Sequence, residues 1–167
     1  RDTNDTGVFY LEQVPGLQFS PRLATEGKGH GIVVWNDLGG VQGEPTARVK
    51  LFNFSSPAAA AADKSIRLTE LVGYQALPFP VYMNDNASFI IGWTSKADWS
   101  DSNIHAVALA LDGRLLDSPP VPLFATSDDE VGVAFARSQT PASAALVFGE
   151  LDLNTQTLHP TPNELDI

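Results

Sequence analysis

The residues best suited to chemistry gather in one polar stretch, residues 94–103, which contains Asp98, Trp99, Asp101 and Asn103. An aromatic ring beside carboxylates in an exposed loop is typical of a sugar-binding site. The ring packs against C–H groups while the oxygens accept hydrogen bonds from hydroxyls. The stretch therefore predicts a ligand-binding site made of these four residues. The structural alternative is that Trp99 folds back over the edge of a sheet.

The same loop could bind a cation. Ca²⁺ takes about six to eight oxygen ligands, and Asp98 and Asp101 are the candidate ligands here. Their spacing differs from that of an EF-hand loop, and no glutamate follows at the distance that a bidentate ligand would need. A solvated polar turn is the alternative. Apart from this calcium site, the sequence predicts no cofactor.

No motif of a nucleophilic or metal-dependent enzyme occurs in the chain. His30, His105 and His159 are far apart and lack nearby partners for a triad, and neither G-x-S-x-G nor H-E-x-x-H occurs. Carboxylates for glycoside hydrolysis could come from many positions: Asp37, Glu44, Asp98, Asp101 and the run 128–130. Nothing in their spacing selects two of them, so the sequence favours a protein without catalysis.

The charge balance limits the possible partners. Ten Lys and Arg, no two of them adjacent, stand against twenty Asp and Glu, which gives a formal net charge of −10. Nucleic-acid binding needs clustered cations, so the composition argues against it. No apolar stretch approaches the ~18 residues that cross a bilayer, which argues against membrane insertion. The absence of cysteine removes disulfides and thiol nucleophiles.

Three N-x-S/T sequons, at Asn4, Asn53 and Asn86, are candidate N-glycosylation sites. Asn and Ser are also common in turns, which is the alternative interpretation. The chain begins at Arg1 and not at Met, as in a processed mature protein or a segment of a longer one. Together these features predict a secreted or cell-surface location.

A short apolar strand that ends in an aromatic residue recurs along the chain. Its three copies are residues 31–35, 89–93 and 131–135, which end in Trp35, Trp93 and Phe135. A polar loop, a second apolar strand and a short third segment follow each copy. Apolar runs of this length are typical of β-strands, and the aromatic residues are expected to pack in the core.

The repeat divides one β-rich domain, residues 1–167, into units. We expect three full units, residues 31–86, 87–130 and 131–167, and a partial N-terminal unit, residues 7–30, that lacks its first strand. Two segments interrupt the pattern. The alanine-rich stretch at 57–63 predicts a short helix, and the proline-rich stretch at 77–82 predicts an extended linker.

Repeated units of three or four strands are typical of β-propeller blades. The pattern resembles propeller-like repeats of secreted bacterial surface proteins, in which an apolar strand ending in Trp precedes a variable loop and an Asp-Gly turn. Only Asp112-Gly113 carries that turn as written. The resemblance implies an all-β fold of antiparallel units. A β-sandwich is the alternative, because a closed propeller needs at least about four blades.

Three functions are compatible with this sequence. The leading expectation is an extracellular structural or assembly subunit that forms a homo-oligomer or filament through its sheet edges. An unpaired edge strand accepts a strand from a neighbouring chain. The alternative is a carbohydrate- or cell-surface-binding module with a glycan as partner, and the third is a glycoside or ester hydrolase.

Overall fold

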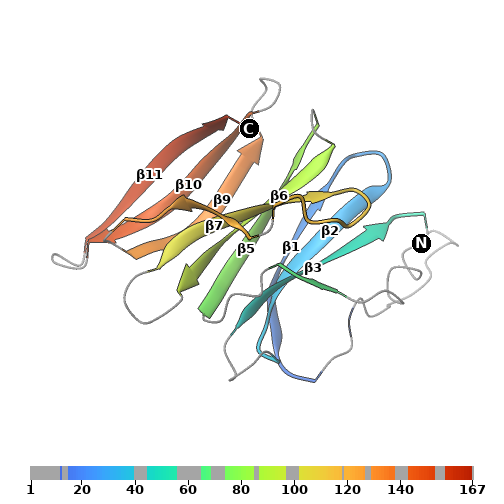
Figure 1. Ribbon diagram of the computed structural model, residues 1–167, viewed down its shortest axis with the longest axis horizontal. Coiled ribbons are helices and arrows are strands. Elements are labelled where there is room, and N and C mark those ends of the chain that lie inside the picture. Colours follow the sequence, from blue (N-terminus) through green and yellow to red (C-terminus); the bar gives the residue numbers. More distant parts are fainter. Residues whose placement is uncertain are drawn as a thin grey trace, which may run out of the picture.

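The computed structural model of the chain describes residues 12, 15–39, 45–55, 65–68, 74–84, 87–96, 102–117, 119–126, 129–137, 143–152 and 157–166. These residues form three antiparallel sheets that follow one another along the chain (Figure 1). The expected all-β fold of repeated antiparallel units is therefore confirmed. The helix expected at 57–63 falls outside the described residues. Among the described segments, none is a helix long and apolar enough to cross a membrane.

The first and second sheets each have four strands in chain order. The first consists of β1 (Gln18–Thr25), β2 (His30–Asp37), β3 (Thr46–Asn53) and β4 (Ile66–Arg67). The second consists of β5 (Tyr74–Met83), β6 (Ser88–Lys96), β7 (Asn103–Ala110) and β8 (Val121–Phe124). The third sheet has three strands: β9 (Asp129–Arg137), β10 (Ser143–Asp152) and β11 (Thr157–Asp166).

The sheets pack face to face in succession, and their first strands lie together. β5 contacts β1 on one side and β9 on the other. We call β1, β5 and β9 the inner strands. We call the face of a sheet on the side of the following sheet in the chain its forward face, and the opposite face its back face. This arrangement is propeller-like, with one sheet per blade.

Two apolar clusters hold the blades together. The first lies between the first and second sheets and includes Ile32, Val34, Ala47, Val49, Phe89, Ile91, Trp93, Val107 and Leu109. The second lies between the second and third sheets and includes Val81, Met83, Ile90, Ile104, Ala106, Val133, Phe135, Leu146 and Phe148. β6 is almost wholly buried because it has a neighbouring sheet on both faces, which explains its continuous apolar run.

A β-bulge recurs on each inner strand. The pairing register shifts between Phe19 and Arg22 on β1 and between Ala76 and Phe79 on β5. It also shifts on β9, which pairs with β10 on either side of Gly132. A residue with positive φ lies in each bulge: Ser20 (54°), Leu77 (54°) and Gly132 (67°). A bulge bends its strand and increases the local twist, so the three inner strands bend in the same way.

The first and second sheets each begin one strand earlier than the full units expected at 31–86 and 87–130, whereas the third sheet begins with β9, close to the expected start at residue 131. The segment 22–25, expected in the partial N-terminal unit, belongs to β1 and pairs with β2. The expected linker at 77–82 lies within β5 and pairs with β6. Prolines are tolerated there because β5 is an edge strand of its sheet and carries a bulge.

The third copy of the repeat is also placed differently. Trp35 and Trp93 lie on the second strand of their sheets, whereas Phe135 lies on β9, the first strand of its sheet. Phe148 on β10 has the equivalent position beside the inner-strand bulge. The core role expected for the three aromatic residues is confirmed, because Trp35, Trp93 and Phe135 are 5%, 0% and 7% exposed.

Candidate functional site

The structure describes one of the four predicted ligand-binding residues. Asn103 is the first residue of β7, is half-buried and pairs with Ser95. Asp98, Trp99 and Asp101 lie outside the described residues, so the predicted sugar and calcium sites stay predictions. Among the described residues, no group of three or more His, Asp or Glu side chains could hold a metal ion.

Of the three sequons, Asn53 lies within the described residues, whereas Asn4 and Asn86 fall outside them. The Asn53 side-chain carbonyl accepts a hydrogen bond from the Ser55 N–H at 2.8 Å. Its amide nitrogen lies 3.4 Å from His30 Nε2. The Asn53 side chain thus stabilises the turn that follows β3, and glycosylation there stays a prediction.

The described candidate carboxylates have structural partners at the blade ends. Asp37 is 1% exposed. One of its oxygens lies 2.6 Å from Arg48 Nε, and the other accepts the Gly39 N–H at 2.8 Å. Glu130 is fully buried and accepts hydrogen bonds from the backbone and the hydroxyl of Thr126.

Asp129, next to Glu130, is also held in place. Burial acts to raise the pKa of its carboxyl, but the N–H and the hydroxyl of Ser102 and the Lys96 ammonium outweigh that effect and lower it. The Ser102 groups donate from 2.6 and 2.9 Å, and Lys96 Nζ lies 3.6 Å away. Asp129 is therefore a charged anchor between β9 and the segment before β7.

A groove of about 450 Å³ opens where the inner strands meet. Its lining comes from all three sheets: Arg22 of β1, Leu77 and Phe79 of β5, residues 131–134 of β9, and Val147, Phe148 and Gly149 of β10. We call this hollow the axial groove. The central channel of a propeller lies at the same place, where the first strands of its blades converge.

Among the described residues that line the axial groove, Arg22 is the one with a charged side chain. Its guanidinium carbon lies 5.7 Å from the centre of the Phe79 ring, a cation–π contact. Arg22 is exposed, and no described carboxylate forms an ion pair with it. Its N–H groups are therefore available to a ligand.

The sequence interpretation missed this groove. Arg22 and Phe79 are far apart in the chain, and Phe79 lies in the stretch expected to be a linker. The only local signal is an arginine between two apolar residues on a strand. Arg22 reaches Phe79 only because β1 packs against β5, and a local sequence pattern does not encode that packing.

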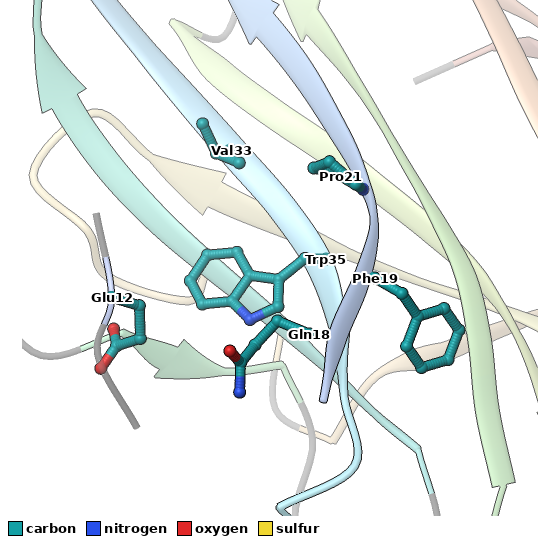
Figure 2. A pocket seen from close by; sticks show the side chains of 6 residues that line it. All are labelled: Glu12, Gln18, Phe19, Pro21, Val33 and Trp35. Carbon is teal, nitrogen blue, oxygen red and sulfur yellow. The ribbon is translucent and has the colours of Figure 1, made fainter. Parts of the chain in front are cut away.

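A second, smaller pocket of about 210 Å³ lies on the back face of the first sheet. It is lined by Glu12, Gln18, Phe19, Pro21, Val33 and Trp35. In Figure 2 the side chains of Glu12 and Gln18 lie beside the Trp35 indole, whereas the Phe19 ring points away from it. Next to this pocket, Glu12 lies 3.6 Å from the buried ammonium of Lys50.

The fold is similar to that of solved structures. It matches the endo-arabinase from Bacteroides thetaiotaomicron VPI-5482 with a TM-score of 0.63 and 13% identity, over 97% of this chain and 61% of that chain. It matches the alpha-L-arabinofuranosidase from Lactobacillus brevis with a TM-score of 0.56 and 13% identity, over 89% of this chain and 52% of that one.

Comparison of the sequence with protein-family models and with curated proteins finds no match. At 13% identity the structural likeness shows the fold alone. The chain spans between about half and three-fifths of the length of these two neighbours. It therefore has an all-β, propeller-like fold and corresponds to part of the neighbours' chains.

Proposed function

We propose that this chain is a carbohydrate-binding propeller-like protein whose ligand lies in the axial groove. The observation that carries the proposal is the contact of the exposed Arg22 with the Phe79 ring in a hollow lined by the three inner strands and β10. The names of the two structural neighbours support the choice of a sugar, since both are arabinose-related.

The lining of the groove suits a sugar better than an ion. Its apolar residues, such as Leu77 and Val147, can pack against the C–H face of a ring. The guanidinium of Arg22 can donate several hydrogen bonds to hydroxyl or carboxylate oxygens of the same ligand. A volume of about 450 Å³ is within the range of small-molecule sites.

Binding fits this groove better than hydrolysis does. Glycoside hydrolysis generally uses two carboxyl groups that flank the scissile bond, about 5–9.5 Å apart. The described residues that line the groove include no Asp or Glu. Asp37 and Glu130 are buried elsewhere, and each has a partner within the described structure. We therefore infer a non-catalytic role for the described groove.

Assembly with another β-sheet is a second candidate function, and a different observation favours it. Val147 on β10 is 43% exposed, although it lies on the kind of sheet face that the next blade covers elsewhere in this chain. The contact would use a sheet face, which differs from the edge pairing expected from the sequence. As part of this second proposal, the chain would be a repeat of a secreted surface protein and would be located outside the cell or on its surface.

Calorimetric titration with linear arabinan oligosaccharides tests carbohydrate binding. We expect the Arg22→Ala variant to bind at least about tenfold more weakly, because a hydrogen bond to a charged group contributes about 1.5–3 kcal/mol. Arg114→Ala is the matched control, since Arg114 is exposed on the turn after β7. Equal effects of the two substitutions, or no binding by the unaltered protein, would contradict the proposal. Release of reducing sugar would contradict a non-catalytic role.

A further inference from the structure

The pocket on the back face of the first sheet, which we call the back-face pocket, is lined by two residues with an unpaired buried polar atom (Figure 2). One atom is Nε1 of Trp35, an N–H donor on a residue that is 5% exposed. The other is Oε2 of Glu12, a carboxylate acceptor on a side chain that is 17% exposed. Neither atom has a hydrogen-bond partner within the described structure. Since a buried polar group without a partner costs free energy, the pair points to a ligand that bonds to both.

The strands of the first sheet direct these groups into the pocket. Val33 and Trp35 alternate along β2 and therefore share its back face, while Gln18 of β1 lines the adjoining wall. Figure 2 shows the indole nitrogen on the edge of the Trp35 ring toward Gln18 and Glu12. Nε1 of Trp93 is also unpaired, but Trp93 lies inside the first apolar cluster. The combination of a donor, an acceptor and a pocket thus marks the site, and not an unpaired indole alone.

The charges beside the back-face pocket favour a neutral ligand. The carboxylate of Glu12 lies 3.6 Å from Nζ of Lys50, which is itself buried. The other carboxylate on this face, that of Asp37, lies 2.6 Å from Nε of Arg48. Each of these two carboxylates therefore already has a basic partner. A ligand in the pocket needs polar groups for Trp35 and Glu12, but it does not need a charge of either sign.

We propose that the back-face pocket binds a single ring of a neutral sugar through its hydroxyl groups. A hydroxyl both donates and accepts, so hydroxyls of one ring accept the Trp35 N–H and donate to the Glu12 carboxylate. Pro21 and Val33 supply apolar walls for the C–H groups of the ring. The volume of about 210 Å³ is below the range of about 300–1,000 Å³ that is common for drug-sized ligands, which restricts the pocket to a small molecule.

This site is separate from the axial groove. Arg22, which lines the axial groove, pairs with Val34, and Val34 packs in the cluster between the first and second sheets. Val33 and Trp35, on either side of Val34, point to the opposite face and line the back-face pocket. The two hollows therefore lie on opposite faces of the first sheet. The inference is independent of the ligand proposed for the axial groove, because neither site contributes a residue to the other.

The size and lining of the pocket favour a sugar ring over ordered water as the partner of the two atoms. A water molecule also donates and accepts, but it needs only about 30 Å³, whereas the pocket has about 210 Å³. Buried water needs about two to four polar partners, and Pro21, Val33 and the face of the Trp35 ring offer none. A molecule with both hydroxyl and C–H surfaces satisfies the whole lining.

The indole N–H signals in a proton–nitrogen correlation spectrum report on this pocket directly. The chain has three tryptophans, and Trp35→Phe identifies the signal of Trp35. Addition of D-xylose or L-arabinose to the unaltered protein should shift that signal to saturation. Half-saturation is expected at about 1–10 mM, as for a ligand of about ten non-hydrogen atoms. Absence of a saturable shift with both sugars would overturn the proposal and leave ordered water as the partner.

Two variants place the sugar in the pocket. Val33→Phe fills the pocket from its wall and should weaken binding at least tenfold, whereas Val121→Phe is the matched control, since Val121 is 47% exposed on β8. Glu12→Gln keeps the shape of the side chain and should weaken binding about fivefold, because a charged acceptor forms the stronger hydrogen bond. Arg22→Ala, in the axial groove, should leave the Trp35 shift unchanged. A shift that survives Val33→Phe, or one that Arg22→Ala removes, would show that the sugar binds elsewhere.

Discussion

The side-chain carbonyl of Asn36 accepts a hydrogen bond of 3.0 Å from the backbone N–H of Leu77. Its Nδ2 donates to the carbonyl of Gln75 at 2.7 Å, and the side chain is completely buried. Asn36 thereby fixes the bulge of β5 to the second strand of the preceding sheet. Thr94 repeats the contact one blade further on, where its hydroxyl accepts the Gly132 N–H at 3.0 Å.

Replacing Asn36 should destabilise the packing of the first two sheets. Asn36→Leu keeps the approximate volume but leaves the Leu77 N–H and the Gln75 carbonyl without this partner. An unpaired buried polar group costs about 1–3 kcal/mol, so the free energy of unfolding in urea should fall by at least that amount. Thr94→Val removes one hydrogen bond and should cost less. Wild-type stability of Asn36→Leu would show that this contact between the blades is dispensable.

Gly92→Ala should destabilise the packing of the second sheet against the third. The new Cβ would lie 2.5 Å from Phe135 Cε2, and overpacking of a core costs about 1–3 kcal/mol. Adding Phe135→Leu to the same chain shortens the opposing side chain and should restore part of that loss. The four free energies of unfolding form a double-mutant cycle, in which simple additivity would contradict the close contact.

His105 should make the protein less stable in mild acid. Its ring stacks on Trp93, with centroids 6.3 Å apart and planes at 23°. Burial lowers the pKa of His105, and a backbone hydrogen bond with Asn103 opposes this only in part. Because the unfolded chain takes up this proton at about pH 6.5 and the folded protein does so at lower pH, stability falls as the pH falls below ~6.5.

The measurement for His105 is the free energy of unfolding in urea at pH 7.5, 6.5 and 5.5. His105→Gln removes the titrating group, so we expect a smaller loss of stability between the first and last pH than in the wild-type protein. The comparison uses the slope with pH and not the absolute stability, which the substitution itself can change. Identical slopes in the two proteins would contradict a lowered pKa of His105.

Much of the fold could be predicted from local patterns. The apolar runs around Trp35 and Trp93 identified two central strands and their buried rings, because a strand covered on both faces leaves a continuous apolar signal. The pattern also placed Phe135 on a core strand, but it assigned that strand to the wrong position in its sheet. Apolar character reports burial, whereas strand order depends on which neighbour completes the hydrogen-bond ladder.

The candidate site was less accessible to prediction. The loop 94–103 was predicted as a site because its polar side chains are neighbours in sequence. Of its four predicted site residues, only Asn103 lies within the described structure. The axial groove combines Arg22 with Phe79, whose proximity depends on the packing of two sheets.

Local sequence specifies the β-strands and the buried rings, since both follow from side chains next to one another on a strand. The blade boundaries, the equivalence of Phe148 with Trp35 and Trp93, and the exposure of Val147 and Leu23 follow instead from the three-dimensional packing. Those features arise from register shifts and sheet-on-sheet packing between distant segments, where the free energy depends on contacts that no local stretch contains.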